Sequence, residues 1–107
     1  MPTYNKLVRD LIPNIIQSTG KEFRTRILDE QEYTVELNRK LKEESEEYFA
    51  VKNSEEALEE LADILEVIRA LADAHGSNWD QLEALREKKA EERGGFRDRV
   101  YLIDVDD

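Results

Sequence analysis

Hydrophobic residues in the middle of the chain recur at alternating steps of three and four, the spacing of one face of an α-helix. The first such stripe follows Asp29 and Glu32, a D-x-x-E pair that is typical of a helix start. The stripe consists of Tyr33, Leu37, Leu41, Glu44, Tyr48 and Val51. The pattern predicts a long helix over about 30–52 in which a carboxylate occupies one stripe position.

A second long helix is predicted over about 55–75, between the break at Asn53-Ser54, with Ser54 as its N-cap, and the stop at Gly76. One of its stripes is Leu58, Leu61, Leu65, Ile68 and Ala72, and the other is Ala57, Glu60, Ile64, Val67 and Leu71. Two stripes predict a helix buried on much of its circumference, as the central member of a bundle. Because the break is short, we expect the two long helices to be antiparallel neighbours.

Shorter elements flank these helices. A short helix is predicted between Asp10, as its N-cap, and Gly20. A fourth helix is predicted over about 79–93, with Ser77 or Asn78 as its N-cap. The residues from 96 onward look extended. The predicted fold is all-α, an antiparallel bundle of about four helices with a short extended C-terminal tail, in a single domain over 1–107.

Composition narrows the function. The 107 residues are 39% hydrophobic and 39% charged, with a net charge of −10, so a partner that is a nucleic acid polymer is disfavoured. The absence of cysteine excludes disulfides, zinc–thiolate sites and cysteine nucleophiles. No leader-like or membrane-spanning apolar run is present, so we expect a soluble, cytoplasmic protein without a membrane partner.

Two acidic pairs stand out because they interrupt apolar stripes. Glu44 and Glu47 lie on one helical face at i, i+3, and Glu60 and Asp63 do so on the next helix. Carboxylates at core-facing positions are costly unless they are paired, and four that converge favour a hard divalent cation such as Mg²⁺, or Mn²⁺. Two alternatives stay open, a solvated acidic face and a buried ion pair such as Lys40 with Glu44.

These acidic motifs also resemble a family. E-E-x-x-E over 43–47 and E-x-x-D over 60–63 resemble the signature of the all-α nucleoside-triphosphate pyrophosphohydrolases, the MazG-like superfamily, which includes phosphoribosyl-ATP pyrophosphohydrolases. The start over 4–13 and the end over 89–96 are similar to a small single-domain branch of that superfamily. The resemblance implies a Mg²⁺-dependent enzyme that releases a nucleoside monophosphate and pyrophosphate, and it suggests removal of non-canonical nucleotides. The metal ligands it implies are Glu44, Glu47, Glu60 and Asp63.

Further roles can be assigned on the same basis. A carboxylate not fully used by the metal would serve as general base, with Glu47 as the first choice and Glu43 as the second. The resemblance favours contacts with the nucleotide substrate for Asn5, Lys6, Arg9, Lys89 and Arg93. Ordinary surface cations, and for the last two the complement of a helix dipole, are the alternatives.

The sequence leaves other functions open. One is hydrolysis of phosphoribosyl-ATP, and another is a non-catalytic acidic helical module that binds a basic protein. Many apolar residues on thin helices also predict a homodimer or a dimer of dimers.

Overall fold

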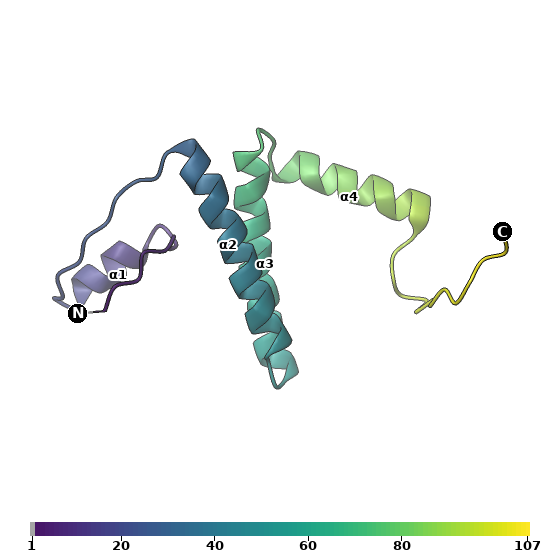
Figure 1. The fold of residues 1–107 in the computed structure, drawn as a ribbon, viewed down its shortest axis with the longest axis horizontal. Coiled ribbons are helices and arrows are strands. Elements are labelled where there is room, and N and C mark those ends of the chain that lie inside the picture. Colours follow the sequence, from purple (N-terminus) through teal and green to yellow (C-terminus); the bar gives the residue numbers. More distant parts are fainter. Residues whose placement is uncertain (1) are drawn as a thin grey trace.

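The computed structural model describes residues 2–107 and is all-α. Its helices are α1 (Ile12–Ser18), α2 (Glu30–Phe49), α3 (Ser54–Ala74) and α4 (Trp79–Arg93), and these residues include no strand (Figure 1). The all-α prediction is therefore confirmed. The tail after α4 is irregular and includes a turn at residues 97–98, where an extended segment was expected. No helix in this range combines the length and apolar character that crossing a bilayer requires.

Short-range signals in the sequence set most helix ends. The side chain of Asp29 accepts a 2.8 Å hydrogen bond from the backbone N–H of Glu32, and the Glu32 side chain accepts one from the Asp29 N–H, so the predicted capping box is confirmed. Of the two candidates for the cap of α4, Asn78 is the one whose side chain accepts a hydrogen bond from the helix, at the backbone N–H of Gln81. The cap of α3 is Asn53, not the predicted Ser54, because the backbone is still extended at Asn53 and already helical at the serine.

The N-cap predicted for α1 is wrong. Leu11, and not Asp10, is the capping residue, and no side chain caps this helix. Pro13 lies in the first turn and has no backbone N–H, so this end of the helix has one fewer donor to satisfy. The Asp10 carboxylate is therefore not used by α1.

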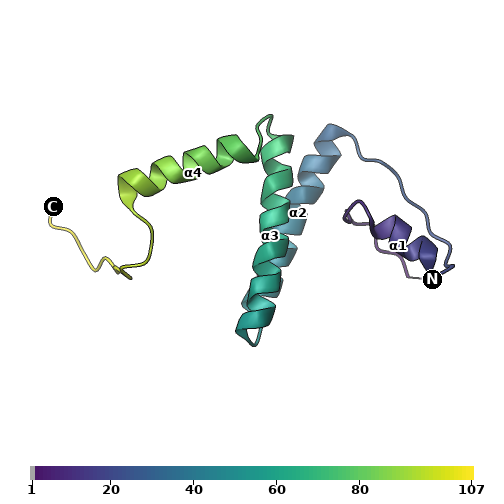
Figure 2. The same cartoon turned by 180° about the vertical axis from the view of Figure 1, so that it is seen from behind.

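The centre of the molecule is an antiparallel pair of long helices, α2 and α3, which we call the hairpin. Figures 1 and 2 show α1 beside this hairpin on one flank and α4 leading away from it on the other. The chain turns between α3 and α4 at Gly76, whose φ of +79° suits glycine. The expected antiparallel arrangement is confirmed for α2 and α3, while α4 does not run alongside them.

A large surface is left uncovered by this arrangement. The accessible surface is 10088 Å², against about 6,200 Å² for a folded monomer of this size. The radius of gyration is 18.4 Å, whereas a compact domain of this length has about 13 Å. Among residues 2–107 only Leu37 and Ala72 count as buried hydrophobic residues. One chain alone therefore builds very little core.

The uncovered surface includes half of an expected stripe of α3. The stripe with Glu60 and Val67 faces α2, as predicted. In the other stripe, Leu58 is 70% exposed, and Leu61 and Leu65 are nearly half exposed. In the first half of α3, therefore, only the face toward α2 is covered, and the prediction that two faces are buried is not met there.

Candidate metal centre

Three acidic side chains from the two hairpin helices converge on one point. Glu44 and Glu47 come from α2 and Glu60 from α3, and one carboxylate oxygen of each lies within 4.8 Å of the others. The i, i+3 spacing places the first two on one face of α2, and the antiparallel hairpin brings Glu60 to the same height. We call these three residues the carboxylate cluster.

Two oxygens of the carboxylate cluster are buried and have no hydrogen-bond partner among the described residues. They are Oε2 of Glu44 and Oε2 of Glu60. Burial, followed by the approach of the Glu60 and Glu47 carboxylates, raises the pKa of Glu44 to about 7. Burial and the Glu47 charge also raise the pKa of Glu60. The negative charge of the cluster is therefore not fully compensated.

A divalent cation fits this donor set. Mg²⁺ binds oxygen at about 2.0–2.1 Å, so two ligands on opposite sides of one ion lie about 4.2 Å apart. The mutual limit of 4.8 Å among the three oxygens is close to that span, and small side-chain rotations close the difference. Oxygen-only ligands suit Mg²⁺ or Mn²⁺. Glu44, Glu47 and Glu60 could therefore hold such an ion, and the ion would supply the missing charge.

Asp63, the fourth predicted ligand, lies beside the cluster but has a cation of its own. The guanidinium Nη2 of Arg9 donates a 2.6 Å hydrogen bond to its Oδ1. Lys6 Nζ likewise lies 3.6 Å from Oε1 of Glu43, the second candidate for general base. Lys6 and Arg9 thus hold the N-terminal segment against both hairpin helices, next to the carboxylate cluster.

Lys40 provides a further cation on α2. Its Nζ lies 3.9 Å from Oε1 of Glu44 and 4.0 Å from Oε1 of Glu43, so the ion pair considered for Lys40 and Glu44 is present as a loose contact. The Glu44 side chain is only 13% exposed, yet its other oxygen stays without a partner. Lys40 therefore compensates the charge of the cluster only in part.

The other predicted substrate contacts divide into two groups. Asn5 precedes Lys6 in the N-terminal segment and adopts a positive φ of 45°, a conformation that asparagine tolerates better than most residues. Lys89 and Arg93 lie on α4, which leads away from the hairpin, so a single chain does not bring them to the cluster (Figures 1 and 2). Their role in binding stays a prediction.

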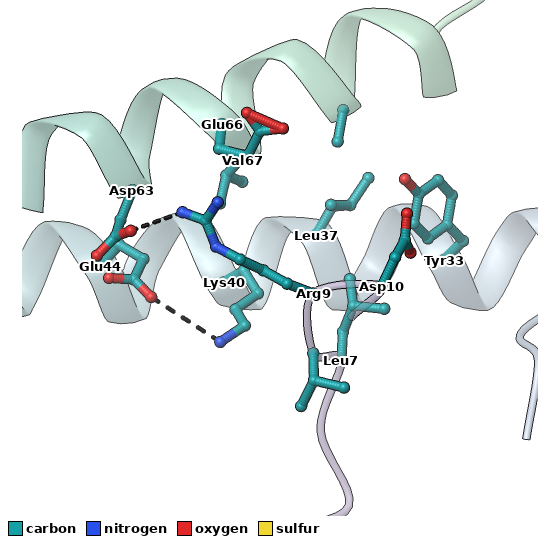
Figure 3. Close-up of a pocket in the computed structure, with 12 residues that line it drawn as sticks. Leu7, Arg9, Asp10, Tyr33, Leu37, Lys40, Glu44, Asp63, Glu66 and Val67 are labelled. Carbon is teal, nitrogen blue, oxygen red and sulfur yellow. Dashed lines mark hydrogen bonds and ion pairs between the residues drawn. The ribbon is translucent and has the colours of Figure 1, made fainter. Parts of the chain in front are cut away.

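Sequence reasoning did not anticipate the cavity beside the cluster. Tyr33, taken only as a stripe residue, and Asp10, taken as a helix cap, both line it together with Leu37 and Val67 (Figure 3). Glu44 and Asp63 line the same cavity at its acidic end. The spacing of Tyr33 and Glu44 on one stripe of α2 was a usable signal. The position of Asp10 was not, because it depends on how the N-terminal segment folds back.

Comparisons of the chain with family models, with curated proteins and with solved structures gave no match.

Proposed function

We propose that the chain is a Mg²⁺-dependent pyrophosphohydrolase of the MazG-like type, which cleaves a nucleoside triphosphate into a nucleoside monophosphate and pyrophosphate. The observation that carries the proposal is the carboxylate cluster, in which Glu44 and Glu60 each keep a buried oxygen without a partner. Buried acids without partners are costly for a structural protein, and a bound cation removes that cost. The motif resemblance supplies the substrate class.

The chain's own residues fit the steps of this reaction. A bond forms between a water oxygen and the α-phosphorus, the bond from that phosphorus to the bridging oxygen breaks, and pyrophosphate leaves. Glu47 is the exposed member of the cluster and is our candidate to accept the water proton. The metal, when bound, supplies charge neutralisation and water activation.

Cations around the cluster suit a polyanionic substrate. Lys6, Arg9 and Lys40 each lie against a carboxylate at or beside the metal centre. When a bound metal reduces the negative charge of the cluster, these side chains can exchange their carboxylate partners for phosphate oxygens of a substrate bound beside it. We infer that the N-terminal segment supplies phosphate contacts from Lys6 and Arg9.

Pyrophosphate release from a panel of nucleotides, with Mg²⁺ and with chelator, tests the proposal. We expect Glu44→Gln to lower turnover by about 100-fold or more, since loss of an outer-shell partner alone typically costs 10–100-fold. Asp63→Asn reports on the fourth predicted ligand. The matched control is Glu59→Gln, an exposed acid of α3 outside the cluster. Equal turnover in wild type and Glu44→Gln would contradict the proposal. The same panel includes phosphoribosyl-ATP, the alternative substrate.

The ion pairs favour a second candidate, a non-catalytic acidic helical module. Arg9 neutralises Asp63 and Lys6 neutralises Glu43, as in a structural network of ion pairs. Such a module gains no thermal stability from Mg²⁺, whereas an enzyme with this metal centre does. A melting scan with Mg²⁺ and with chelator separates the two.

We also propose that the chain functions as a homo-oligomer in the cytoplasm, where free nucleotides are found. The support is the excess of exposed surface and the uncovered stripe of Leu58, Leu61 and Leu65 on α3. A second copy that covers this stripe would give α3 the second buried face that its sequence pattern predicts.

A further inference from the structure

A cavity of about 220 Å³ lies between the N-terminal segment and the hairpin, directly beside the carboxylate cluster (Figure 3). Its walls differ in character. Glu44 and Asp63 line one end, while Leu37, Val67 and Tyr33 line the other. The acidic end belongs to the metal centre already described, but the proposed chemistry gives no role to the apolar end.

The lining changes in a regular order along α2. Tyr33, Leu37, Lys40 and Glu44 follow one face of this helix at steps of four, three and four. At 1.5 Å per residue, Glu44 lies about 10 Å along the axis from Leu37. The face therefore passes from an aromatic ring through an aliphatic side chain and a cation to a carboxylate. This is the order in which a nucleotide presents its base, its sugar, its phosphates and their metal.

We propose that the apolar end of this cavity is a nucleobase subsite, in which Tyr33 packs against the base and Asp10 accepts hydrogen bonds from its edge. The proposal rests on the proposed function, since it assumes a nucleotide whose phosphates lie at the carboxylate cluster. It adds the placement of the base and the chemical class of base that the site favours.

The size of the cavity leaves no room for a whole nucleotide. Pockets that enclose whole drug-sized ligands measure about 300–1,000 Å³, and this one is smaller. The proposal therefore places only the base in the cavity, against the ring of Tyr33, with the sugar and phosphates toward Lys40 and the cluster. Stacking of a base on an aromatic side chain is worth about 5- to 150-fold in affinity.

Asp10 sets the kind of base. An ionised carboxylate only accepts hydrogen bonds, so Asp10 favours a base edge that carries N–H donors and disfavours one that presents carbonyl oxygens. Guanine offers two adjacent donors on one edge, N1–H and the 2-amino group, which match the two oxygens of a carboxylate. Hypoxanthine lacks the 2-amino group. The favoured class is therefore guanine-type purines.

Binding measurements test the subsite separately from turnover. Dissociation constants are measured by NMR titration, with Mg²⁺ present, for GMP, IMP and ribose 5-phosphate. For wild type we expect GMP to bind about tenfold or more tightly than ribose 5-phosphate, and severalfold more tightly than IMP. Tyr33→Ala should remove most of the preference for GMP over ribose 5-phosphate. Tyr33→Phe, which keeps the ring, should retain that preference. Asp10→Asn should reduce the preference for GMP over IMP.

Two further variants serve as controls. Tyr101→Ala removes a tyrosine from the exposed tail and leaves both ratios unchanged. Glu44→Gln weakens all three ligands, through their phosphates, but preserves the ratio of GMP to ribose 5-phosphate. A Tyr33→Ala variant with disturbed helicity by circular dichroism is replaced by Tyr33→Leu, which keeps apolar volume without the ring and has the same expected loss.

The outcomes distinguish the two proposals. If nucleoside triphosphates are hydrolysed in a Glu44-dependent manner but Tyr33→Ala and Tyr33→Leu keep the wild-type ratios, the subsite is overturned and the proposed function stands. If GMP binding depends on Tyr33 while no nucleotide is hydrolysed, the subsite stands and the proposed function fails. Wild type that binds GMP no better than ribose 5-phosphate also overturns the subsite.

Discussion

The hairpin and the region after it use similar residues in different ways. In the hairpin, side chains from α2 and α3 meet each other, and Leu37 is only 4% exposed. In α4 and the tail, apolar residues of the same kind meet solvent, and Phe96 is 97% exposed. The hairpin also carries the carboxylate cluster and its cavity.

The difference shows which parts of the fold one chain can complete. A helix stripe is stabilised only when another apolar surface covers it. The inner stripe of α3 is covered by α2. Within residues 2–107, nothing covers Leu58, Leu61 and Leu65 in the same way, and Val100 and Ile103 in the tail are also exposed. The comparison predicts that the hairpin is the local unit of order and that the remaining apolar surface belongs to an assembly.

Among the predicted effects, the largest should be the loss of self-association when lysines replace leucines of the uncovered stripe. Because Leu61 and Leu65 are nearly half exposed, two copies that bury them gain about 0.7–1.4 kcal/mol for each leucine in each chain. We expect wild type to sediment as a dimer or tetramer, with a melting temperature that rises with concentration. Leu61→Lys with Leu65→Lys should be monomeric, while Glu59→Lys, an exposed control on α3 away from this stripe, should assemble normally. A monomeric wild type would show that the stripe is not a self-association surface.

A pair of leucine truncations compares the two regions directly. Leu37→Ala creates a cavity in the hairpin and should lower the free energy of unfolding by about 2–5 kcal/mol, measured by urea denaturation. Leu102→Ala in the tail should change it by less than about 0.5 kcal/mol. A clearly larger loss from Leu102→Ala would mean that an assembly covers the tail, which would narrow the difference between the regions.

Mg²⁺ should stabilise the protein through the hairpin and not through α4. At a Mg²⁺ concentration 100 times the dissociation constant, the free energy of unfolding should rise by about 2.7 kcal/mol by mass action. Glu60→Gln should remove most of this gain, while Asp80→Asn, an acid on α4, should retain it. Thermal scans with Mg²⁺ and with chelator measure the effect. A melting temperature that does not change when Mg²⁺ is added would favour the acidic module over the enzyme.

The carboxylate cluster should also make the stability depend on pH. The pKa of Glu44 is raised to about 7 in the folded chain from an ordinary value near 4.5, so the folded state binds this proton more tightly. Without metal, stability should therefore fall as the pH rises from about 4.5 to 7 and then level off. Glu44→Gln should flatten this slope. Because metal competes with the proton, Mg²⁺ affinity should increase over the same range. Melting temperatures and Mg²⁺ titrations between pH 5 and 8 measure both trends.

Local features were the most predictable part of this protein. The capping box at Asp29 was predicted correctly, and the cap of α4 was narrowed to Ser77 or Asn78, because each depends on residues within one turn. The meeting of Glu44, Glu47 and Glu60 also followed from helical spacing and a short connection. Asp10 was misread as a cap, because its neighbours come from segments distant in sequence.

Contacts across long sequence separations were not predictable in the same way. Whether Asp63 faces a metal or a cation depends on Arg9, which lies far away along the chain and reaches Asp63 only through the path of the N-terminal segment. The direction of α4 likewise depends on the turn at Gly76, where a small change in backbone angles swings the whole helix. Sequence spacing contains no information on either point.

The sequence by itself determined the helices, the hairpin and the acids that interrupt its inner stripes, since these follow from periodicity and from short connections. Only the tertiary structure decided which carboxylates keep unpartnered oxygens, which cations lie beside them, and that a cavity with an apolar end adjoins the cluster. The physical reason is range: helix formation depends on neighbours within a few residues, whereas burial and charge compensation depend on every segment that folds against the site.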